Sequence, residues 1–175
     1  MHLTLGLDYD LPPIALVEER TTWFPAGAVS LGLEQRGVDE ATLRAAYTNE
    51  QRGASAIDDV HDGAIAEDGG LSIHVCESGT RKELLRFDCF AVTPHYHYIP
   101  VDGGNRAIAF DPDANGPMVS WVMTCLRSRL PAMLARAGSN ELASLIDPRA
   151  VASAVDALAA EVHRPQGENS DGQSG

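Results

Sequence analysis

The chain has 175 residues, of which 44% are hydrophobic, and a formal net charge of −12. This length predicts one domain with a substantial core, and the composition is that of a globular protein. The acidic excess disfavours nucleic acids and anionic membrane surfaces as partners, because both are bound largely through Lys and Arg. Small molecules, metal cations and protein partners remain as ligands.

The cysteines and the start of the chain predict a cytoplasmic protein. Cys76, Cys89 and Cys125 are odd in number and lack CxxC spacing, which favours reduced thiols over a disulfide framework. The N-terminus lacks the basic and apolar segments of a secretion signal. No run approaches the ~20 apolar residues of a membrane span.

The N-terminal part of the chain has the weakest pattern. Within residues 1–38, strand-like pieces flank a turn at residues 25–27. Asp39 can cap a helix over about residues 40–52, because its carboxylate can accept N–H groups of the first turn. Residues 54–70 are rich in Ala, Asp and Gly and predict a solvated acidic loop, with a lid or cation-attracting rim as the alternative.

From residue 71 onward, apolar and polar residues alternate with the period of a half-buried strand. Strands are predicted at residues 71–76, 83–90, 94–101 and 106–110, with turn residues between them. Short connections between successive strands favour an antiparallel meander.

The C-terminal third predicts helices. One begins at Pro117 and has apolar residues at three- and four-residue steps. Pro131 should break or kink this helix, because it removes a backbone hydrogen bond. Asn140 can begin a short helix, and Asp147-Pro148 is a capping pair for another.

Together these elements predict an α+β fold, with an antiparallel meander of about four strands and C-terminal helices packed on one of its faces. Residues 1–164 would form the single domain. Residues 165–175, which are mainly small and polar, would form a disordered tail.

The apolar pattern also assigns the two faces of the sheet, because side chains alternate along a strand. The predicted buried face comprises Leu71, Ile73, Val75, Leu85, Phe87, Cys89, Tyr96 and Tyr98. The opposite face, called the polar face below, collects Ser72, His74, Arg86, Asp88, His95 and His97. An even-numbered loop around residues 92–93 would place Asp88 opposite His97 and Phe90 opposite His95.

This polar face predicts a site for a divalent metal, Zn²⁺ or Fe²⁺. His95 and His97 are two residues apart on one strand, so their side chains point the same way ~6.6–7 Å apart and can share one ion. His74 is a further candidate ligand. Asp88 is a candidate ligand or catalytic group, and Arg86 could hold an anionic substrate or orient the Asp88 carboxylate. The function predicted first is a metal-assisted small-molecule enzyme or binding protein.

Other interpretations remain open. Without a metal, Asp88 and His97 could form a general base. A register shifted by one residue would bring Cys89 to the histidines as a nucleophile. His95 and His97 could instead face solvent or an interface. The protein would then be a non-catalytic interaction or accessory module, similar to an antitoxin, whose polar face binds a protein partner.

The run R-F-D-C-F-x₃-P-H-Y-H-Y at residues 86–98 is followed by W-x₄-L and R-L-P-x-M-L-x-x-A-G. It resembles a small uncharacterised bacterial domain family over about residues 71–160, which implies domain boundaries and no activity. The R-F-D and P-H-x-H elements are more loosely similar to some small bacterial toxin–antitoxin proteins. The H-x-H pair also resembles the first metal-binding motif of cupins, but the Glu and Gly of that motif are missing and Pro100 stands there.

Overall fold

The computed structural model describes residues 5, 8–9, 14–39, 41–42, 67–101 and 103–164. Asp39 accepts a hydrogen bond from the N–H of Thr42 at 2.7 Å, as expected of a cap. The rest of the helix predicted at residues 40–52, most of the acidic loop and the predicted tail lie outside the described residues.

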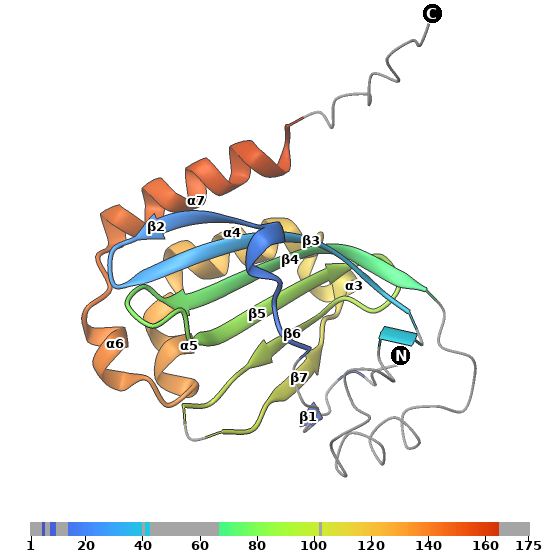
Figure 1. Cartoon of the computed structure of the whole chain (residues 1–175), viewed down its shortest axis with the longest axis horizontal. Helices are drawn as coiled ribbons and strands as arrows, with labels where there is room; N and C mark the ends of the chain where they lie inside the picture. The colour runs from blue at the N-terminus through green and yellow to red at the C-terminus, as the bar shows by residue number, and fades with distance from the viewer. Residues whose placement is uncertain are drawn as a thin grey trace, which may run out of the picture.

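The described strands form one antiparallel sheet in the order β1-β7-β6-β5-β4-β3-β2 (Figure 1). Their bounds are β1 Asp8–Tyr9, β2 Thr21–Ala26, β3 Val29–Val38, β4 Asp68–Glu77, β5 Glu83–Phe90, β6 His95–Tyr98 and β7 Arg106–Ala109. Strands β2 to β7 follow one another as a meander, and β1 joins the β7 edge. The α+β meander is therefore confirmed. It has more than the expected four strands, because the N-terminal part supplies β1, β2 and β3.

The α-helices lie on one face of this sheet, and a 3₁₀ helix precedes β2 (Figure 1). Their bounds are the 3₁₀ helix η1 Glu18–Arg20 and the α-helices α3 Pro112–Asn115, α4 Met118–Ser128, α5 Leu130–Arg136, α6 Asn140–Ser144 and α7 Pro148–Val162. Helix α7 packs along β2 and β3 and against α4, while α4 and α5 contact β5. Pro131 lies in the first turn of α5, which confirms the predicted break. Asp147 caps α7 by accepting the N–H of Arg149 at 2.9 Å.

The predicted buried face forms the core beneath these helices. Its residues are buried or pack against the buried cluster. Trp121 of α4 contacts Phe87, Tyr96 and Phe110, with ring centroids 5.0–6.1 Å apart. The aromatic rings thereby join the sheet to the helical layer.

The polar face is also buried. The segment of residues 14–17 runs across this face between β1 and η1 (Figure 1). Its Val17 N–H donates to Glu34 at 3.3 Å, and Arg36 donates to the carbonyls of Ile14 and Ala15 at 3.4 and 3.2 Å. The side chains of the polar face are therefore buried rather than exposed.

The register between β5 and β6 differs from the expected one by two residues. Asp88 pairs with His95, and Arg86 pairs with His97. The expected opposition of Asp88 and His97 is therefore wrong, because the last pair of this hairpin is Asp88 and His95, which leaves residues 89–94 in the connection. A shift of two keeps every side chain on its face, so the polar face retains its membership.

Among the described residues, none of the helices combines the length and the apolar character that crossing a membrane requires.

Candidate metal centre

Asp88 on β5 and His95 and His97 on β6 bring three candidate ligand atoms together on the polar face. These atoms all lie within 4.8 Å of one another. Asp88 Oδ2 is 3.1 Å from His97 Nε2 and 3.3 Å from His95 Nε2. The three residues are only 4–6% exposed. Two imidazole nitrogens and one carboxylate oxygen are a donor set that suits Zn²⁺ or Fe²⁺.

The outer nitrogen of His95 is bound to the backbone. His95 Nδ1 lies 2.6 Å from the carbonyl oxygen of Thr93. A carbonyl can only accept a hydrogen bond, so Nδ1 carries the hydrogen and the Nε2 lone pair of the neutral ring faces Asp88. Histidines that bind metals are typically held this way, with the non-ligating N–H donated to a carbonyl or carboxylate.

The outer nitrogen of His97 has a similar partner in Asn105. His97 Nδ1 lies 3.1 Å from Asn105 Oδ1, and Asn105, just before β7, is 1% exposed. In the sequence, residue 105 belongs to the turn residues between two predicted strands, and this role is not evident from its neighbours. A Gly-Gly-Asn turn carries no local signal that separates a buried Asn from an exposed one.

Ser72 on β4 orients the carboxylate from the other side. The Ser72 hydroxyl donates to Asp88 Oδ1, which leaves Oδ2 facing the two imidazoles. Phe90 packs edge-on against His95, with centroids 5.7 Å apart. An aromatic side chain thus lies beside the ligand group and limits the access of water to it.

The charge states of His95 and Asp88 are set by burial and by neighbouring groups. Burial lowers the pKa of His95 to about 4, although the negative charge of Asp88 opposes the shift. Burial alone would raise the pKa of Asp88, but the hydrogen bond from His97 and neighbouring positive charges lower it well below its usual range. At neutral pH a lone pair of His95 therefore faces an ionised carboxylate oxygen. Two electron-rich atoms 3.3 Å apart repel each other, and a proton or a metal ion between them would remove the repulsion.

The structure places His74 outside this ligand group. Its ring nitrogens face Glu83 Oε1 at 2.6 Å and Glu34 Oε2 at 3.4 Å. Burial alone would lower the pKa of His74, but the hydrogen bonds to Glu34 and Glu83 raise it. Nδ1 is thus hydrogen-bonded to Glu83, while Nε2 lies within ion-pair distance of Glu34.

Arg86 lies between His74 on β4 and His97 on β6. Its Nε and Nη2 bind the two oxygens of Glu83 at 2.8 and 2.5 Å. Two of its donors are therefore committed to this buried, bidentate pair rather than directed at a substrate. Its charge still favours the ionised form of Asp88.

Cys89 lies on the opposite face, packed against the core. The one-residue shift that would bring it to the histidines is wrong, because Cys89 pairs with Leu71 and Asp88 with His95. Burial raises the pKa of the Cys89 thiol to about 12. An uncharged thiol on the core face does not suit a nucleophile.

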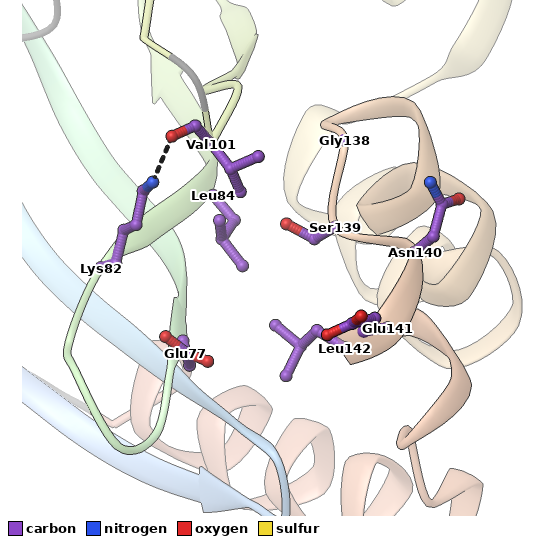
Figure 2. Close-up of a pocket in the computed structure, with 9 residues that line it drawn as sticks. All are labelled: Glu77, Lys82, Leu84, Val101, Gly138, Ser139, Asn140, Glu141 and Leu142. Atoms are coloured by element: carbon purple, nitrogen blue, oxygen red, sulfur yellow. Dashed lines mark hydrogen bonds between the residues drawn. The ribbon is translucent and has the colours of Figure 1, made fainter.

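A cavity of about 460 Å³ lies elsewhere, between the β4–β5 hairpin and the turn joining α5 to α6 (Figure 2). The Lys82 ammonium on its rim donates to the Val101 carbonyl at 2.6 Å. None of the three candidate ligands lines this cavity.

Residues 23–162 match the family model described as a domain of unknown function, DUF7700. The chain belongs to this family. The match extends from β2 to the end of α7, so the DUF7700 domain contains the whole candidate ligand group. It agrees with the resemblance to an uncharacterised domain family. Neither the curated proteins nor the solved structures give a match.

Proposed function

We propose that this DUF7700 protein binds a divalent metal ion through Asp88, His95 and His97, and uses the ion in chemistry on a small molecule. The convergence of two imidazole Nε2 atoms on one Asp88 oxygen carries the proposal. The Nδ1 atoms of both rings lie beside oxygen acceptors, so both Nε2 atoms face Asp88, and an ion would take the place of the hydrogen bond between His97 Nε2 and Asp88. Arg86 would favour the ionised carboxylate without itself binding the metal.

The described residues supply three candidate ligands, and this number favours reactivity over a purely structural role. Structural zinc sites usually have four protein ligands, whereas catalytic zinc sites and the two-histidine, one-carboxylate sites of non-haem iron have three. Three protein ligands leave a coordination position for water or substrate. An ion held in this way can polarise a bound oxygen or lower the pKa of a bound water.

The test is the metal content of the purified protein, followed by titration of the metal-free protein with Zn²⁺ and with Fe²⁺ under anaerobic conditions. The wild type is expected to bind one ion per chain, and a His95→Ala/His97→Ala variant none. His163→Ala is the matched control, because His163 is exposed and its Nδ1 bonds to the Ala159 carbonyl at the end of α7. Wild-type protein that takes up neither ion, or a double variant that binds as well as His163→Ala, would refute the proposal.

A further inference from the structure

We infer that Asp68, which lies outside the ligand group, is a positioning residue that sets the geometry of the metal site. The inference rests on the proposed metal function. It concerns the turn of residues 91–94, because this turn joins the strand that carries Asp88 to the strand that carries both histidines.

Asp68 is the first residue of β4, and its carboxylate holds this turn from the side. Oδ1 accepts the Val92 N–H at 3.0 Å, while Oδ2 accepts the Thr93 N–H at 2.8 Å and the Thr93 hydroxyl at 2.5 Å. Oδ1 also accepts the N–H of Gly69 at 2.8 Å. Successive backbone N–H groups directed at one anion form a concave binding site, and hydrogen bonds to a carboxylate are stronger than neutral ones.

The same turn residue connects Asp68 to the candidate ligand. The N–H and hydroxyl of Thr93 bind Asp68, and the Thr93 carbonyl accepts the Nδ1 hydrogen of His95 at 2.6 Å. The orientation of the His95 ring therefore depends on the Thr93 backbone, which the Asp68 carboxylate holds. His95 Nε2 in turn lies 3.3 Å from Asp88 Oδ2.

The ends of the turn have their own hydrogen bonds, which isolates the contribution of Asp68. The Ala91 N–H donates to the Gly69 carbonyl at 3.1 Å, and the Pro94 carbonyl accepts the Phe110 N–H at 2.9 Å. These bonds persist without the Asp68 side chain. Loss of the carboxylate should therefore release residues 92 and 93 and leave the surrounding ladder paired. A variant without the Asp68 carboxylate should therefore still fold, but its His95 ring should be misoriented.

The inference is tested with Asp68→Ala and Asp68→Asn, the second of which keeps one acceptor oxygen. Asp111→Ala is the matched control, because Asp111 also accepts two backbone N–H groups, at 3.0 and 3.1 Å, but at the start of α3.

Zn²⁺ affinity is measured by chelator competition at a temperature where circular dichroism shows each variant folded. We expect Asp68→Ala to bind ~10–100-fold more weakly, as for partners of metal-binding histidines. Asp68→Asn should be intermediate and Asp111→Ala unchanged.

A second measurement does not need the metal. The imidazole ¹⁵N shifts of His95 in metal-free protein should show one Nδ1–H tautomer in the wild type and a tautomer mixture in Asp68→Ala, with partial rescue in Asp68→Asn. Unchanged shifts together with unchanged affinity would overturn the inference. If the wild type binds no metal, the proposed function fails. The comparison of His95 tautomers then decides alone whether Asp68 positions the His95 ring. If Asp68→Ala does not fold, Asp68→Asn decides both measurements.

Discussion

At the scale of single residues, each candidate histidine ligand is oriented through one oxygen acceptor. Thr93 supplies a backbone carbonyl to His95, while Asn105 supplies a side chain to His97. Only the second acceptor can be removed by a substitution that leaves the backbone unchanged. Asn105 is therefore the more direct test of whether these hydrogen bonds serve metal binding.

We predict that Asn105→Ala weakens Zn²⁺ binding by ~10–100-fold without abolishing it, because the three ligands stay in place while His97 loses its orientation. Asn105→Asp keeps an oxygen acceptor and should bind more tightly than Asn105→Ala. Isothermal titration of the metal-free variants measures the difference. Asn115→Ala is the control, since Asn115 is exposed and its side chain bonds to the carbonyl of Asp111 in α3. Equal affinities for the two alanine variants would contradict the prediction.

His74 should make stability depend on pH. Its folded-state pKa is raised because Glu34 and Glu83 outweigh the effect of burial; the same carboxylates are also paired with Arg36 and Arg86. A group whose pKa is raised on folding contributes stability that is complete below its unfolded pKa, ~6.5 for His. This contribution is lost as the pH rises through the folded pKa.

Replacing His74 with Gln should therefore lower the free energy of unfolding more at about pH 6 than at about pH 9. Urea denaturation of wild type and His74→Gln at both values measures this, and groups that titrate equally in both proteins cancel. A difference that is constant or grows with pH would show that the charged form of His74 is not favoured in the folded protein.

At the scale of elements, strand β4 approaches its neighbour closely at Gly70. A Cβ added there would lie 2.5 Å from the Cys89 carbonyl oxygen of β5, whereas one added at Gly79 in the hairpin turn would meet nothing within 4 Å. We predict that Gly70→Ala lowers the free energy of unfolding by ~1–3 kcal/mol, since backbone must move to accept the methyl group. Gly79→Ala should stay within ~0.5 kcal/mol of wild type. Guanidinium denaturation compares the two, and equal effects would contradict the prediction.

The face assignment could be predicted from the sequence because it depends only on alternation. A register shift of two residues therefore left the polar face intact. The pairing itself could not be predicted, because the turn that sets it is held by Asp68, 25 positions before Thr93. The alternation of apolar and polar residues also does not tell how far apart two residues on the same face lie. His74 pairs with Arg86, and Arg86 with His97, so a whole strand separates the two histidines.

Strand β3 shows a second limit of sequence patterns. Its burial is nearly continuous, yet its sequence contains Glu34 and Arg36, which are 0% and 7% exposed. Local patterns interpret charged residues as solvent-facing, but these two are buried because they pair with each other, with His74 and with residues 14–17. Such compensation comes from segments distant in sequence.

At the scale of the whole molecule, the two faces of the sheet differ in what buries them and in the groups they carry. One face is apolar and covered by helices, while the other carries buried charged groups that cost free energy unless they are paired. Most of these groups form pairs within the protein, and under the proposed function an ion would neutralise the contact between His95 and Asp88. An ion at this position should therefore stabilise the entire fold and not only the site.

We predict that saturating Zn²⁺ raises the stability of metal-free wild type. An ion that binds only the folded state at 100 times its Kd adds ~2.7 kcal/mol, which for a domain of this size raises Tm by roughly 5–10 °C. Differential scanning fluorimetry with and without Zn²⁺, reversed by a chelator, measures the shift. His95→Ala/His97→Ala should show no shift, and His163→Ala the full one. An equal shift in the double variant would mean that the ion binds elsewhere, such as on the acidic surface, and that Asp88 and the two histidines are not its ligands.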